Sequence, residues 1–123
     1  MLLVAFGADR VNLLTVGERR YFLFHHEGRT RLVADACPHR GGPLHLSVRA
    51  CDAAKLVCPW HETATPERRV AARDVPMVRV GTRACAVFDL PPETHVVRRW
   101  TEGAVVGAPA VRPRPRPAGA RAA

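Results

Sequence analysis

CPHRGGPL at residues 37–44 and CPWH at residues 58–61 each place a cysteine and a histidine close together, beside proline or glycine. Thiolate and imidazole together are ligands that zinc and iron accept, whereas magnesium and calcium prefer oxygen ligands. A predicted strand leads into each motif, so two neighbouring strand ends can present four ligands to one centre. We therefore expect one metal centre to be bound by Cys37, His39, Cys58 and His61.

Two kinds of centre fit this ligand set. One is a closed zinc site, which is structural and redox-inert. The other is a two-iron cluster in which two cysteines bind one iron and two histidines bind the other. Zinc fingers usually take both cysteines from one half of the motif and both histidines from the other half. Here each segment supplies one of each, which favours a cluster held between the two segments.

The rest of the sequence predicts a small all-β domain. Short segments rich in β-branched and aromatic residues alternate with turn signals, which is typical of antiparallel strands. Such a meander would bury one face of each strand and leave the other face in water. The polar residues 62–74 are not assigned. We expect strands at residues 2–6, 11–16, 20–26, 31–36, 56–58, 75–80 and 84–90, and a further strand or a docked segment at 95–100.

The 123 residues suffice for one domain, which we place at residues 1–100. Residues 101–123 are predicted to form a flexible basic tail, in which arginine and proline alternate at residues 112–117. The chain carries a net charge of +8, of which residues 98–123 supply +5 through six arginines and one glutamate. No aromatic residues alternate with the tail arginines, so nucleic acid is not a favoured partner.

The sequence contains no apolar stretch of membrane-spanning length, and its first residues lack the basic start of a secretory signal. We therefore expect a cytoplasmic protein with no membrane partner. Four cysteines in such a chain are metal ligands or free thiols more often than disulfides. Cys51 and Cys85 are expected to be buried free thiols, and His45 to be a solvated loop histidine.

The two motifs together resemble those of Rieske ferredoxins and of the Rieske domains of ring-hydroxylating oxygenases. The similarity covers about residues 2–90. RRYFLFHHEGRTRLVADACPHRGG at residues 19–42 resembles the hairpin that leads into the first ligand segment of that family. VPMVRVGTRACAVFDL at residues 75–90 resembles the closing hairpin of the family. The resemblance implies a small Rieske-like β-sandwich with two cluster-binding loops at one tip.

The resemblance also implies the cofactor, which is one 2Fe–2S cluster per chain. Cys37 and Cys58 would bind the inner iron, and His39 and His61 would bind the outer iron near the surface. This assignment turns the general expectation of a metal centre into a site that carries single electrons.

Several neighbouring residues would adjust such a cluster. Gly41 and Gly42 permit tight turns, so that backbone N–H groups can point at the sulfurs and raise the reduction potential, while Leu44 would shield the cluster from water. Respiratory members of the family carry an extra cysteine in each ligand loop, and Gly42 and Trp60 occupy those places here. The chain thus resembles the oxygenase-associated type. Glu62 stands where the family usually has glycine, and its charge would lower the potential.

We expect an electron carrier and not an enzyme, because an oxygenase of this superfamily needs a second domain with a two-histidine, one-carboxylate iron site. The predicted tail leaves no room for one. The implied protein partners are a flavin-dependent reductase and a terminal oxygenase. Two other hypotheses remain open: a non-redox or degenerate Rieske-fold interaction subunit of a larger enzyme, and a zinc-stabilised binding module that uses the same four residues.

Overall fold

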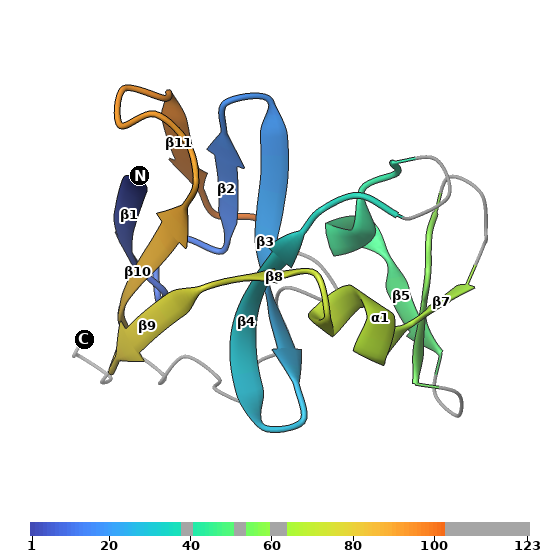
Figure 1. Ribbon diagram of the computed structural model, residues 1–123. Coiled ribbons are helices and arrows are strands. Elements are labelled where there is room, and N and C mark those ends of the chain that lie inside the picture. The colour runs from blue at the N-terminus through green and yellow to red at the C-terminus, as the bar shows by residue number, and fades with distance from the viewer. Residues whose placement is uncertain (38–40, 51–53, 60–63, 103–123) are drawn as a thin grey trace.

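Three antiparallel sheets build the chain, and they follow one another across the molecule (Figure 1). The structure is a computed structural model that describes residues 1–37, 41–50, 54–59 and 64–102. The elements in chain order are β1 (Leu2–Gly7), β2 (Leu13–Val16), β3 (Arg19–His26), β4 (Arg29–Ala34), η1 (Leu44–Leu46), β5 (Val48–Ala50), β6 (Lys55–Val57), β7 (Ala64–Pro66), α1 (Glu67–Ala71), β8 (Asp74–Val75), β9 (Met77–Val80), β10 (Arg83–Phe88) and β11 (Val96–Arg99).

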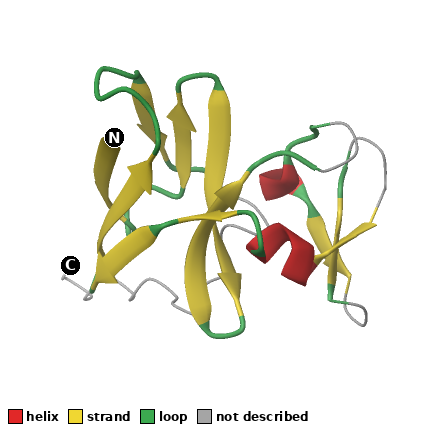
Figure 2. Cartoon of the chain, in the orientation of Figure 1, coloured by secondary structure: helices red, strands yellow, loops and turns green. Residues whose placement is uncertain are grey.

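Each sheet has its own strand order. The outer sheet has the order β1-β10-β9, and the central sheet has the order β11-β2-β3-β4-β8. The third sheet, β5-β6-β7, lies at the opposite end from the outer sheet, and together with η1 and α1 it forms what we call the small lobe (Figure 2). The described part of the chain consists mostly of antiparallel strands, with the five-residue α1 and the short η1 beside them, so the predicted all-β class is confirmed.

The hairpin between β3 and β4 shows how local sequence sets the register. His26 pairs with Arg29, so the connecting loop consists of Glu27 and Gly28 alone. Both loop residues have positive φ, 52° at Glu27 and 78° at Gly28. A two-residue loop with two positive φ angles is a type I′ turn, whose twist matches that of the strands it joins. This turn fixes which residues of β3 and β4 face each other.

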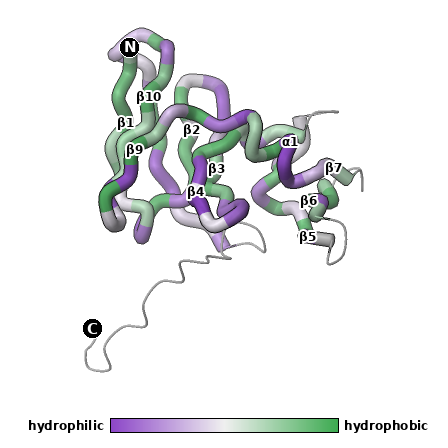
Figure 3. Tube along the Cα trace, turned by 60° about the horizontal axis from the view of Figure 1, so that its bottom comes forward, coloured by the Kyte–Doolittle hydropathy of each residue, from purple (hydrophilic) through white to green (hydrophobic). Residues whose placement is uncertain are grey.

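The central sheet is buried on both faces, which corrects the expectation that one face of each strand would lie in water. Phe22, Leu23 and Phe24 are consecutive in β3, and all three are buried. Leu32 and Val33 in β4 are likewise fully buried. The outer sheet covers one face of the central sheet and the small lobe covers the other, so alternate residues enter two separate cores. Green apolar stretches accordingly run along β2 and β3 in Figure 3.

The small lobe contains the elements that the sequence left unassigned. Residues 64–66 form β7, and α1 follows it directly. The side chains of Val70 and Ala71 are buried from this helix. Arg49 of β5 ties the lobe together, because it donates hydrogen bonds to Oε1 of Glu67 at 2.9 Å and to the carbonyl oxygen of His25 at 3.0 Å. Its guanidinium also lies 5.2 Å from the ring centroid of Phe24. The lobe is therefore fastened to β3.

The last described strand, β11, pairs with β2 and confirms a strand within residues 95–100. The side chain of Asn12 secures its end by exchanging hydrogen bonds with the backbone of Thr101. Residues 103–123, which hold most of the predicted tail, lie outside the described residues. No helix in the described part of the chain combines the length and the hydrophobicity needed to cross a membrane.

Candidate metal centre

The fold brings the two predicted cysteine ligands into one core. Cys37 lies shortly after the end of β4, and Cys58 directly follows β6. Their exposed fractions are 3% and 0%, and both belong to the same buried cluster as Leu44 and Leu56. Two thiols from segments far apart in the sequence thus meet in the interior between the central sheet and the small lobe. Leu44 is fully buried beside them, as a shielding residue would be.

A tight turn surrounds Cys37. Its N–H donates to the carbonyl oxygen of Gly42 at 2.8 Å, and its carbonyl oxygen accepts from the N–H of Gly41 at 2.9 Å. The N–H of Gly42 donates to Sγ of Cys37 at 3.3 Å. Gly41 has φ of +72°, a conformation that glycine adopts without strain. The expectation that a backbone N–H of these glycines points at the sulfur of Cys37 is confirmed at Gly42.

Hydrogen bonds also hold the backbone of the two residues before Cys37, Asp35 and Ala36. The carbonyl oxygen of Asp35 accepts from Arg20 at 3.1 Å, and the N–H of Asp35 donates to the carbonyl oxygen of Arg20 at 2.8 Å. Arg73 follows α1, and its guanidinium donates to the carbonyl oxygen of Ala36 at 2.6 Å. Arg20 of β3 and Arg73, which follows α1, therefore fix the backbone just before Cys37.

Sequence reasoning missed Asp35 and misjudged His45. His45 was expected to be solvated, but its side chain is only 12% exposed and contacts the fully buried carboxylate of Asp35. The reason for the difference is that η1 turns His45 back toward the end of β4. The only signal in the sequence was an acidic residue before the first motif and a histidine after it, and no periodicity connects positions ten apart.

The two predicted histidine ligands, His39 and His61, lie outside the described residues, as do Cys51, Trp60 and Glu62. Within the described ranges, no group of three or more His, Cys, Asp and Glu side chains is placed to hold a metal ion. The four-ligand set consequently remains a prediction, of which the structure positions the two thiols.

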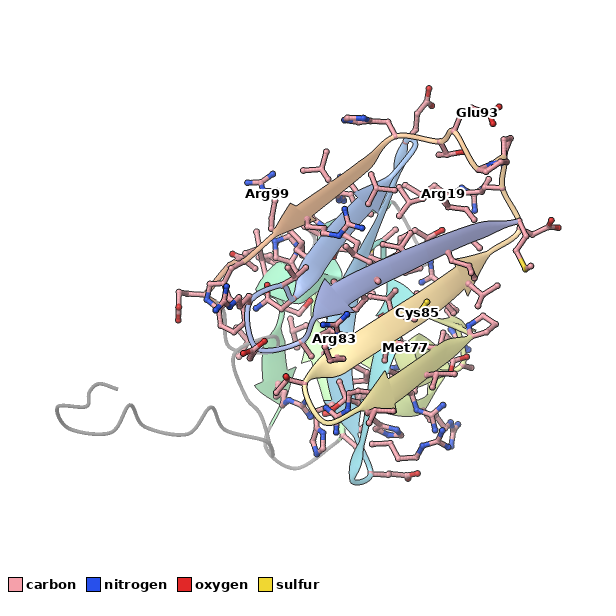
Figure 4. The ribbon with its side chains drawn as sticks, turned by 90° about the vertical axis from the view of Figure 1, so that its left-hand side faces the viewer. Arg19, Met77, Arg83, Cys85, Glu93 and Arg99 are labelled. Carbon is pink, nitrogen blue, oxygen red and sulfur yellow. The ribbon has the colours of Figure 1, made fainter. Side chains whose placement is uncertain are left out.

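Cys85 lies apart from this site and is half-buried, where a buried thiol was expected. Its neighbours Ala84 and Ala86 point into the core, so the Cys85 side chain faces outward from the outer sheet. Figure 4 shows it on β10, with the small lobe behind. The central sheet separates Cys85 from Cys37 and Cys58, so it is not a further ligand of the same centre.

The described residues suit a metal–sulfur centre by their chemistry. The thiolate is the soft ligand that zinc and iron–sulfur clusters take, and two thiols are buried together here. The hydroxyl of Ser47, which is fully buried directly after η1, has no hydrogen-bond partner in the described structure. Buried hydroxyl groups rarely stay unpaired, so this donor is available to a group bound inside the lobe.

These observations define a small antiparallel β protein in which two loops carry a buried pair of thiols. The sequence model of the Rieske [2Fe-2S] domain matches residues 5–88, and the chain belongs to this family. A human "Rieske domain-containing protein" is 39% identical over 53 residues, which cover 38% of this chain and 31% of the human protein. The chain thus matches less than a third of that relative's length. No solved structure matches the chain significantly.

Membership of the family has direct consequences. Rieske domains are electron-transfer modules of oxidoreductase systems, and the family typically binds a 2Fe–2S cluster. The match includes both ligand motifs, at residues 37–44 and 58–61. The role of Cys37 and Cys58 as metal ligands stays a prediction.

Proposed function

We propose that the chain is a Rieske ferredoxin that carries single electrons from a flavin-dependent reductase to a terminal oxygenase in the cytoplasm. Cys37, His39, Cys58 and His61 would hold one 2Fe–2S cluster. The observation that carries this proposal is the burial of Cys37 and Cys58 in one core, with the N–H of Gly42 directed at a ligand sulfur. When bound, such a cluster takes up and releases one electron.

The chain's own residues would set the conditions for this transfer. Leu44 and Leu56 exclude water from the side of the two cysteines. The Gly42 N–H stabilises negative charge on Sγ of Cys37, and this favours the reduced state over the oxidised state. The function that we propose for these residues is the transport of an electron.

The surface of the small lobe supports an acidic protein partner. Arg68 and Arg69 of α1 and Lys55 of β6 are exposed there. The large apolar side chains of Leu46 and Val48 are also exposed, with exposed fractions of 46% and 60%. Exposed basic and apolar side chains on the same lobe fit a partner surface that combines carboxylates with apolar residues. Such a partner would approach the end of the molecule where the two cysteines lie.

Electron uptake by the purified full-length chain tests the proposal. Anaerobic titration with dithionite should reduce the chain by one electron, and catalytic amounts of a flavin-dependent ferredoxin reductase with NADH should reduce the same chromophore. Reoxidation by a ring-hydroxylating terminal oxygenase should then follow. A chain that accepts no electron contradicts the proposal. A colourless chain loaded with zinc would then indicate the zinc-stabilised binding module, and a metal-free chain would indicate the non-redox interaction subunit.

A further inference from the structure

In the described part of the chain, the carboxylate of Asp35 contacts His45, which lies after the first ligand segment, and Arg20 of β3. It is 0% exposed. Its Oδ1 accepts from the backbone N–H of His45 at 2.9 Å, and its Oδ2 lies 2.6 Å from Nδ1 of the same residue. Nε of Arg20 lies 3.5 Å from Oδ2. Both oxygens of the carboxylate are thus within hydrogen-bond distance of atoms of His45.

The positions of Asp35 and His45 in the sequence show which parts of the chain their contact connects. Asp35 stands two residues before Cys37, and His45 directly follows the buried Leu44. The chain leaving β4 and η1 therefore lie side by side, as Figure 1 shows. A contact at this place joins the two ends of the segment that carries the first pair of predicted ligands.

We propose that Asp35 and His45 form a clamp that closes the first ligand segment and positions Cys37 for the cluster. The inference rests on the proposed function, since a clamp on a ligand segment has this role only if the cluster is bound. Both are positioning residues, because neither is a ligand and both act through Cys37.

The energetics of the buried carboxylate link it to segment closure. A carboxylate withdrawn from water is strongly unfavourable unless hydrogen bonds replace its hydration. Here two of the contacts that replace the hydration come from His45, at the far end of the segment. Opening the segment would therefore leave the carboxylate with Arg20 as its one remaining side-chain partner in the described structure. The contacts with His45 that replace the hydration of the Asp35 carboxylate therefore form only when the two ends of the segment lie together.

The Asp35–His45 clamp also lowers the entropy cost of holding Cys37 in a fixed position. Bringing the two ends of a flexible segment together costs chain entropy. The Asp35–His45 pair offsets that cost before any metal arrives, while the bonds between Cys37 and Gly42 shape the turn inside it. The thiol of Cys37 is thereby held in a prepared position, as the supporting partners of metal ligands generally achieve.

Variants at His45 test the clamp without disturbing Arg20 or the backbone before Cys37. His45→Phe removes the Nδ1 atom that contacts Oδ2 of Asp35, whereas His45→Asn places an amide nitrogen at nearly the same position. Each full-length chain is loaded with its cluster, and cluster loss to an iron chelator, the EPR spectrum and the midpoint potential are measured. We expect His45→Phe to lose the cluster on the order of tenfold faster, with an altered EPR spectrum, and His45→Asn to behave like the wild type.

Asp74→Asn is the matched control, because it weakens an ion pair with Arg31 at 2.9 Å on the same central sheet and changes none of the described contacts of Asp35 or His45. It should leave the rate of cluster loss and the EPR spectrum unchanged. Wild-type rates and spectra in His45→Phe would overturn the clamp, as would cluster loss that follows only the thermal stability of each metal-free variant. A wild-type chain that holds no cluster would overturn the proposed function and the clamp with it, which is a distinguishable result.

Discussion

The backbone N–H of Gly42 donates a hydrogen bond to Sγ of Cys37 at 3.3 Å, inside the turn that presents the first predicted ligand. Both residues are buried, so water does not compete for this bond. A donor aimed at a ligand sulfur is most valuable when that sulfur carries the most negative charge, which is in the reduced state. In the proposed cluster-bound chain, this hydrogen bond would raise the reduction potential.

Removing this donor should lower the reduction potential. Gly42→Pro deletes the N–H, and Gly42→Ala retains it, so the two variants separate the hydrogen bond from the change in side chain. If the bond favours the reduced state by about 1 kcal/mol, the midpoint of Gly42→Pro should fall by roughly 40 mV for one electron. Potentiometric titration followed by EPR measures both variants. An unchanged or higher midpoint in Gly42→Pro would contradict this role.

A second prediction concerns the backbone conformation at Gly41. Its φ of +72° strains any residue with a Cβ, although the space around that Cβ is open. Gly41→Ala should therefore lower the free energy of unfolding of the metal-free chain by about 1–2 kcal/mol. Gly28→Ala is the matched control, with φ of +78° and the same open space in the β3–β4 turn.

Denaturant unfolding should show similar losses of stability for these two glycine variants. Only Gly41→Ala should also alter the EPR spectrum of the loaded chain, because Gly41 bonds to the carbonyl oxygen of Cys37. Altered spectra in both variants, or in neither, would show that the turn does not control the ligand position separately from overall stability.

Arg49 provides a third prediction, because it fastens the small lobe to β3. Arg49→Lys loses the planar fork that reaches both Glu67 and the carbonyl oxygen of His25, and should destabilise the chain by about 1–3 kcal/mol. Arg31→Lys alters an exposed pair with Asp74 at the same N–O distance and should cost less than about 1 kcal/mol. Equal losses in chemical denaturation would mean that Arg49 does not secure the lobe.

The fourth prediction tests the basic surface of the small lobe. A chain carrying Arg68→Glu and Arg69→Glu should be reduced about tenfold more slowly by the NADH-driven reductase at low salt, because electrostatic attraction accelerates association. The control carries Arg19→Glu and Arg83→Glu, which change the same charge on exposed residues outside the small lobe, at the start of β3 and on β10 (Figure 4). Stopped-flow reduction with an equal slowing of both chains would indicate a net-charge effect and no docking surface.

Much of the fold could be predicted because its signals are local. The β3–β4 hairpin is specified by Glu27-Gly28 and by the apolar residues on either side. The double burial of β3 could not be predicted, because it depends on a second layer whose elements contain few apolar residues. In α1, only Val70 and Ala71 mark the buried side, and the exposed Arg68 and Arg69 mask that pattern in the sequence.

The candidate site could likewise be predicted only in part from the sequence. The cysteines and the glycines of the first motif could be identified, since thiolates are distinctive ligands and a tight turn needs glycine. The partnership of Asp35 with His45 could not, because it depends on η1 reversing the chain. An aspartate and a histidine separated by ten positions carry no periodic signal. Supporting residues of this kind become visible only when the turn between them is known.

The most direct test of the central claim is the metal and sulfide content of the anaerobically purified full-length chain, measured together with its EPR spectrum after reduction. A Rieske cluster in this chain would give about two irons and two acid-labile sulfides per chain, and the low-average-g signal of mixed cysteine and histidine ligation. Cys58→Ala should abolish both. A chain that contains one zinc and no sulfide, or that keeps its iron in Cys58→Ala, would contradict the presence of this cluster.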